Sequence, residues 1–207
     1  MLTAFTAGLV LITISELGDK TFFIAVILSM QHPRRVVFAG VTAALAVMTI
    51  LSVIFGQLLS TLTQGSKTYV HYAEIVLFIT FGLKLLYDAS KMSVASDTEV
   101  IEEAKEAVEK AKLDSQQKSL WSILLESFVL TLIAEWGDRT QIATIALAAS
   151  HNPIGITVGA ILGHAICAAI AVIGGRLIAG KISERQITFI GGLLFIIFGI
   201  VASIEGS

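Results

Sequence analysis

Two short charged motifs interrupt apolar stretches of this 207-residue chain. Residues 16–21 are ELGDKT, and residues 135–140 are EWGDRT. Each motif has a Glu, then an Asp three residues later and a Lys or Arg four residues later. An ionisable residue at the centre of a membrane helix costs about 2.5–3.5 kcal/mol to insert. Because such residues mark ion or proton sites when they persist in apolar segments, both motifs are candidate functional sites.

The spacing within each motif predicts how its charges are balanced. On a continuous helix, Lys20 and Arg139 would each pair with the Glu four residues earlier. This pairing leaves Asp19 and Asp138 without local partners. If all groups are ionised, each motif carries one net negative charge, so two facing motifs match one divalent cation or two protons. Exchange of a metal ion for protons is the chemistry of an antiporter, and purely structural ion pairing is the simpler alternative.

The oxygen-rich side chains of the motifs favour a hard cation. Thr21, Thr140 and Gln141 are secondary candidate ligands, because hydroxyl and amide oxygens suit Ca²⁺, Mg²⁺ and Mn²⁺. No Cys or Met adjoins either motif in the sequence, which disfavours soft ions such as Cu(I). Gly18 and Gly137 either permit close helix packing or open the helix locally. The predicted primary ligands are the four carboxylates of Glu16, Asp19, Glu135 and Asp138.

Composition places the chain in a lipid bilayer. It is 55% hydrophobic and 14% charged, with a mean hydropathy of +0.85, whereas soluble domains are about 25% charged. The net charge of -2 gives no reason to expect nucleic-acid binding. The sequence lacks the alternating ten-residue segments of a membrane barrel, so we expect an all-α membrane protein.

Six apolar stretches are long enough to cross the bilayer as helices, which takes about 20 residues each. They cover residues 2–30, 36–60, 72–90, 120–149, 154–179 and 187–204. We therefore expect a first three-helix repeat at 1–90, a charged linker at 91–119 and a second three-helix repeat at 120–207. Within the linker, Ser96 and Glu99 predict a capping box at the start of a helix. A solvated connecting helix is the simplest interpretation, with docking of a partner as the alternative.

The two halves resemble each other in sequence. A shift of 119 residues places the first motif on the second, His32 on His151 and Gly40 on Gly159. Because three spans precede a linker too polar to cross the membrane, the second repeat should enter from the opposite face. Such inverted repeats are typical of secondary transporters and place the substrate site near the midplane.

The distribution of basic residues predicts the orientation. Lys20, Lys84 and Arg139 lie within spans and are not counted. If the linker is cytoplasmic, ten of the other eleven Lys and Arg lie inside and only Lys67 lies outside, in agreement with the positive-inside rule. Both termini are then expected outside. The ten inner residues are Arg34, Arg35, Lys91, Lys105, Lys110, Lys112, Lys118, Arg176, Lys181 and Arg185.

Further titratable residues near the span ends are candidates for a proton path. His32 and His151 occupy equivalent span ends, and histidine titrates near neutral pH, although capping of the interface is the simpler interpretation. Glu126 precedes Glu135 by nine residues and is either a proton residue or an interfacial acid. For His164, inside the fifth span, we expect a packing role. Lys20 and Arg139 are candidate gating residues that screen the two access routes.

On these motifs the chain resembles the cation/proton exchanger family marked by two E-x-G-D-[KR]-[TS] sequences. Both ELGDKT and EWGDRT fit, and the resemblance extends over all six stretches. It implies export of Mn²⁺ or Ca²⁺ from the cytoplasm in exchange for protons, with no resident cofactor. The short chain is similar to bacterial members, which implies a bacterial plasma membrane or a thylakoid membrane. The choice between Mn²⁺ and Ca²⁺, and the oligomeric state, stay open.

The sequence leaves three alternative functions open. An amino-acid or other small-solute exporter can be built from similar inverted repeats. An intramembrane aspartyl protease would carry a G-x-G-D motif, but the leading Gly is missing in both copies. A scaffold that only displays the linker would leave the buried charges unexplained.

Overall fold

A computed structural model describes residues 1–63, 67–92, 96–110, 119–178 and 184–205. All regular structure in these residues is helical, which confirms the predicted all-α class. The helices of the described chain are α1 (Leu2–Glu16), α2 (Lys20–Gln31), α3 (Arg34–Leu62), α4 (Lys67–Lys91), α5 (Ser96–Lys110), α6 (Leu120–Ala134), α7 (Arg139–Ser150), α8 (Pro153–Ile178) and α9 (Glu184–Glu205).

In the described part of the chain, four helices are long and apolar enough to cross a membrane, namely α3, α4, α8 and α9. The pair α6 and α7 forms a fifth candidate span, bent by 76° at its break. The apolar helices α1 and α2 are shorter. The stretches 2–30 and 120–149, which were predicted as single spans, are therefore each divided in two, and both breaks fall at a charged motif.

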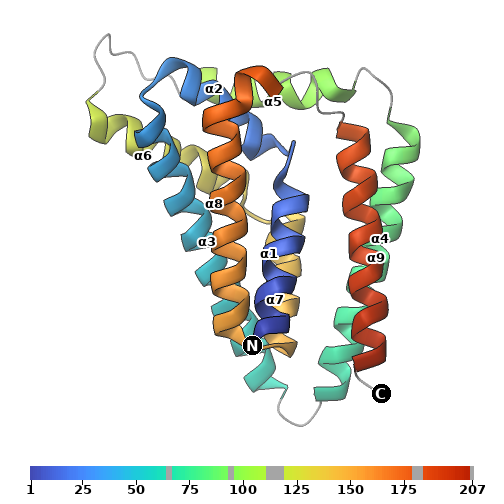
Figure 1. The fold of residues 1–207 in the computed structure, drawn as a ribbon. Coiled ribbons are helices and arrows are strands. Elements are labelled where there is room, and N and C mark those ends of the chain that lie inside the picture. The colour runs from blue at the N-terminus through green and yellow to red at the C-terminus, as the bar shows by residue number, and fades with distance from the viewer. Residues whose placement is uncertain (64–66, 93–95, 111–118, 179–183, 206–207) are drawn as a thin grey trace.

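The broken helices pack against the long helices of the other half. The helix α1 lies along α8, and α6 lies along α3, while α4 and α9 form a separate pair at one side (Figure 1). Glycines permit the close approach: a Cβ at Gly40 of α3 would lie 2.6 Å from the carbonyl oxygen of Leu124 on α6. A Cβ at Gly8 of α1 would lie 2.9 Å from the carbonyl oxygen of Ile156 on α8.

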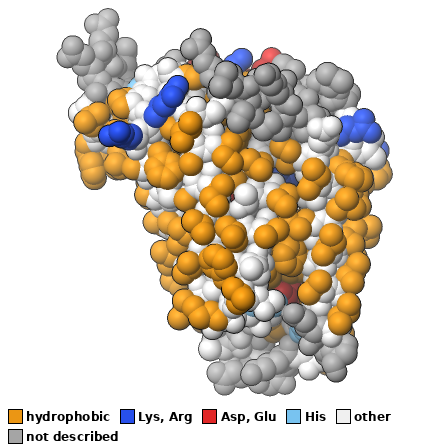
Figure 2. Space-filling model, in the orientation of Figure 1, with side chains coloured by type: hydrophobic (Ala, Val, Ile, Leu, Met, Phe, Trp, Pro, Cys, Tyr) orange, Lys and Arg blue, Asp and Glu red, His pale blue; other side chains and the backbone are white. Residues whose placement is uncertain are grey.

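The molecule has two ends, which we name by what lies there. The N-terminus and the end of α9 lie at one end, the terminal face, and α5 lies at the opposite end, the linker face (Figure 1). Hydrophobic side chains cover most of the visible surface between the two ends, and the visible Lys and Arg lie toward the linker face (Figure 2). This distribution is the one expected for a protein with a bilayer around its middle.

The linker helix α5 packs against α2 rather than standing free in solvent. Ala104 and Val108 are fully buried, and they belong to a core cluster that includes Phe22 and Phe23 of α2. The side chains of the predicted capping box at Ser96 and Glu99 lie outside the described residues. The interpretation of the linker as a fully solvated helix is therefore wrong for its apolar stripe.

Candidate metal site

The two helix breaks are built into the motifs themselves. Gly18 and Gly137 have φ angles of 76° and 83°, in the left-handed region that side chains with a Cβ disfavour. Directly after each glycine, an Asp caps the next helix: Asp19 Oδ1 accepts from the Lys20 amide at 2.7 Å, and Asp138 Oδ2 accepts from the Thr140 amide at 3.2 Å. Of the two uses predicted for the glycines, local opening of the helix is the one observed.

Three carboxylates from the two motifs converge between the broken helices. One oxygen each from Glu16, Glu135 and Asp138 lies within 4.8 Å of the others. The two glutamates are only 3% and 4% exposed. Buried carboxylates at this spacing repel one another unless a cation or protons neutralise them, so the cluster has the donor set and spacing of a hard-cation site.

The fourth predicted ligand, Asp19, is engaged by the opposite motif. Arg139 Nη2 lies 3.0 Å from Asp19 Oδ2 and also donates to the carbonyl oxygen of Ser15 at 3.4 Å. Lys20 turns to the linker helix, with its Nζ 3.2 Å from Glu103 Oε2. The predicted pairing of each basic residue with the Glu four positions earlier is wrong, because the chain leaves the helical path between them.

The secondary candidates surround the carboxylates. The Thr21 hydroxyl donates to Glu16 Oε2 at 3.3 Å, and the Thr140 hydroxyl donates to Asp138 Oδ2 at 3.0 Å. Gln141 Oε1 accepts from the Gly137 amide at 2.7 Å, so this amide group supports the loop that carries the site.

Two polar groups beside the site were not predicted as part of it. His164 Nδ1 lies 3.9 Å from Glu16 Oε1, and His164 is 5% exposed, so this residue is buried directly beside the site. Within the described residues, Glu16 Oε1 and the Ser15 hydroxyl are buried without a hydrogen-bond partner. A buried carboxylate oxygen in this state is a ready ligand for a cation.

The candidate proton residues lie in two histidine–glutamate pairs at opposite ends of the molecule. His32 Nε2 lies 3.9 Å from Glu126 Oε2, near the linker face. His151 Nδ1 lies 3.4 Å from Glu74 Oε1, near the terminal face, and His71 Nδ1 lies 3.9 Å from the other oxygen of Glu74. Glu74 was not among the residues predicted for a proton path, although its i,i+3 spacing from His71 is a usable signal.

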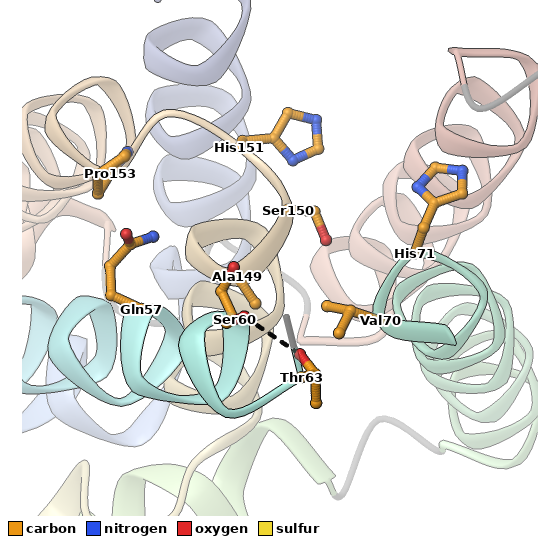
Figure 3. Close-up of a pocket in the computed structure, with 9 residues that line it drawn as sticks. All are labelled: Gln57, Ser60, Thr63, Val70, His71, Ala149, Ser150, His151 and Pro153. Atoms are coloured by element: carbon orange, nitrogen blue, oxygen red, sulfur yellow. Dashed lines mark hydrogen bonds between the residues drawn. The ribbon is translucent and has the colours of Figure 1, made fainter. Parts of the chain in front are cut away.

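A polar cavity of about 360 Å³ opens near the terminal face. It lies between the end of α3, the start of α4 and the turn after α7, with His71 and His151 on its wall (Figure 3). Gln57, Ser60 and Ser150 add further polar groups to its lining. We call this cavity the terminal vestibule.

Comparison with known proteins places these features in a family. The sequence model described as "Divalent cation/proton antiporter GDT1" matches residues 4–93 and 123–207. The chain is 57% identical to GDT1-like protein sll0615 of Synechocystis, over 98% of this chain and 97% of the relative. It is 40% identical to GDT1-like protein 5 of Arabidopsis thaliana, over 97% and 95% of the two chains. No solved structure matches the chain.

Proposed function

The chain belongs to the GDT1 family of divalent cation/proton antiporters, and we propose that it exports Mn²⁺, Ca²⁺ or both from the cytoplasm in exchange for protons. Membership makes it an integral membrane transporter and not an enzyme. The observation that carries the proposal is the convergence of Glu16, Glu135 and Asp138 within 4.8 Å, in a buried position between the two halves. These carboxylates are the proposed cation ligands.

The proposed mechanism is alternating access at this site between two inverted three-span repeats. Reciprocal packing supports it: α1 and α2 of the first half contact α8, and α6 and α7 of the second half contact α3. Each broken helix then brings one motif to the middle of the bilayer from the opposite side. The six-span count takes α1 with α2, and α6 with α7, as one span each.

Charge at the site supports exchange of a cation for protons. The four motif carboxylates and Arg139 carry three net negative charges if all are ionised, because Lys20 is directed to Glu103. A divalent cation together with one proton would neutralise the site, as would three protons. Exchange of one cation for two protons therefore leaves the charge of the site unchanged. Arg139 serves in this scheme as the fixed countercharge for Asp19.

We propose a cytoplasmic linker face and an external terminal face. The concentration of Lys and Arg toward the linker face supports this orientation (Figure 2). Similarity to a cyanobacterial protein supports a bacterial plasma membrane or a thylakoid membrane as the location. We propose that the His32–Glu126 and His151–Glu74 pairs accept and release protons at the two ends of the molecule.

Ion flux in reconstituted vesicles tests the function. Purified protein in proteoliposomes should move Mn²⁺ or Ca²⁺ when a pH gradient is imposed, and excess amino acid should not compete. Glu135→Gln should abolish this flux, whereas Glu106→Gln, an exposed change on α5, should retain it. Flux of an amino acid in place of a divalent cation would instead support the small-solute exporter.

A further inference from the structure

Two small cavities flank the carboxylates, one on each side. The first extends from Glu135 toward the terminal face, and its lining includes Thr49, Ser52, Gln141 and Thr144. The second extends from Glu16 toward the linker face, and its lining includes Phe22, Ala25, Cys167 and Ala168. Each cavity has a volume of about 10 Å³, so each has room for about one water molecule.

The 119-residue repeat relates most of the residues that line the two cavities, although Ala171, the counterpart of Ser52, does not line the second one. Glu135 and Thr140 in the first cavity correspond to Glu16 and Thr21 in the second. The other polar residues are replaced by apolar ones on the linker side. Thr49 corresponds to Ala168, Ser52 to Ala171, Thr144 to Ala25 and Gln141 to Phe22. The two repeats therefore share the Glu and Thr of the site, whereas the flanking side chains are polar on the terminal side and apolar on the linker side.

The hydroxyl groups of the first cavity are oriented to suit a cation. Thr49, Ser52 and Thr144 each donate to the carbonyl oxygen one turn earlier in their own helix, at 2.9, 2.8 and 2.7 Å. Because each hydroxyl donates its only hydrogen to this bond, it can interact with the cavity only through its oxygen lone pairs. Lone pairs attract a metal ion or the hydrogens of its hydration water.

The polar lining continues toward the terminal vestibule. Beyond Ser52, Gly56 and Gln57 of α3 contact α7, and the Gln57 side-chain amide donates to the carbonyl oxygen of Ala148. Gln57 also lines the terminal vestibule (Figure 3). On the linker side, Phe22 and Ala25 belong to the apolar cluster that α5 covers with Ala104 and Val108. Polar groups therefore line both the first cavity and the terminal vestibule, with α3 and α7 in close contact between them, whereas an apolar layer covers the linker side.

We propose that Thr49, Ser52, Thr144 and Gln141 form the route by which a hydrated divalent cation passes between the carboxylate site and the terminal vestibule. This route rests on the proposed function, which it deepens by giving the two half-pathways different chemistry. The terminal route stabilises a partly hydrated ion with hydroxyl oxygens. The equivalent positions of the linker route carry apolar side chains without hydroxyl oxygens. On that side the ion must therefore exchange its hydration water directly for the carboxylates of the site.

An exchange of residues between equivalent positions tests the transport role. The triple variant Thr49→Ala, Ser52→Ala and Thr144→Ala gives the terminal route the lining of the linker route. We expect it to lower Mn²⁺ flux by roughly tenfold or more, because several oxygen contacts to a charged species are lost. Glu106→Gln, an exposed change on α5, is the control and should keep the wild-type flux. Chemical unfolding of the triple variant checks that a loss of flux does not come from loss of the fold. A triple variant with unchanged flux would overturn the proposal.

The reaction of introduced cysteine thiols with Ag⁺ tests the route without a transport measurement. In a Cys167→Ala background, Thr144→Cys and its repeat counterpart Ala25→Cys place single thiols in the two cavities. We expect Ag⁺ added at the terminal face of membrane vesicles to block the thiol of Thr144→Cys, and Ag⁺ at either face to block that of Ala25→Cys far more slowly. Thiols left free are counted by mass-tagging after denaturation. Equal rates, or faster blocking of Ala25→Cys, would overturn the proposed route, whereas absence of cation flux in the wild type would overturn the proposed function alone.

Discussion

Arg139 of the second motif lies 3.0 Å from Asp19 of the first, so the two halves of the chain share one ion pair at the site. The side chains of Arg139 and Asp19 are 29% and 25% exposed, which places the pair at the edge of the buried cluster. The first prediction concerns this pair. Arg139→Gln should lower the free energy of unfolding in detergent by about 1–3 kcal/mol, because the Asp19 carboxylate loses a charge-assisted hydrogen bond.

A double-mutant cycle isolates that interaction. The variant carrying both Asp19→Asn and Arg139→Gln should be less destabilised than the sum of the two single variants, since each single change leaves one charge without its partner. Chemical unfolding of the four proteins measures the difference. Strictly additive effects would show that the contact contributes nothing to stability.

Lys20 and Arg139 occupy equivalent positions in the repeat but should differ in transport. Lys20 Nζ contacts Glu103 on the linker helix, and its side chain is 40% exposed. An exposed pair of this kind contributes little, so Lys20→Gln should keep flux within about fivefold of the wild type. Arg139→Gln, which removes a countercharge from the site, should reduce flux by more than about tenfold. Equal losses in the two variants would restore the symmetric gating role that the sequence suggested.

A single charge introduced into the buried face of α5 should detach this linker helix from α2. Val108 is 1% exposed in the cluster that joins α5 to α2. Val108→Asp would bury a carboxylate in apolar surroundings, and we expect α5 to detach and become open to protease. Limited proteolysis followed by mass spectrometry locates the cuts. Glu106→Gln, on the exposed side of the same helix, serves as the control; similar cutting in both variants would contradict the observed packing.

Two glycine substitutions should separate backbone strain from steric contact. Nothing lies within 4 Å of a Cβ built at Gly137, so Gly137→Ala should cost only the left-handed backbone, about 1–2 kcal/mol. At Gly40 a Cβ would meet the Leu124 carbonyl oxygen at 2.6 Å, so Gly40→Ala should force α3 and α6 apart and cost more. Thermal unfolding in detergent ranks them, with Gly137→Asn expected to be milder than Gly137→Ala.

Much of the candidate site could be predicted from sequence because its carboxylates lie within two short motifs. Charged groups in apolar stretches are costly, so Glu16, Glu135 and Asp138 were predicted as ligands before any geometry was known. The structure brings these three together. The repeat, read from the same sequence, also predicts that the two motifs are equivalent.

The partners of these residues could not be predicted, because helical spacing fails at a break. The i,i+4 rule pairs Arg139 with Glu135, but the positive φ of Gly137 ends the helical path and directs Arg139 to the other half. His164 and Glu74 come from α8 and α4, and only the packing of those helices brings them to Glu16 and His151. Contacts between segments distant in sequence leave no local pattern to detect.

Binding of Mn²⁺ to the purified protein tests whether carboxylates from both motifs hold one cation. The paramagnetic resonance signal of free Mn²⁺ reports the unbound fraction during a titration. We predict one saturable site per chain in the wild type, lost in both Glu16→Gln and Glu135→Gln and retained in Glu106→Gln. Saturable binding that survives in either glutamate variant would contradict a shared site.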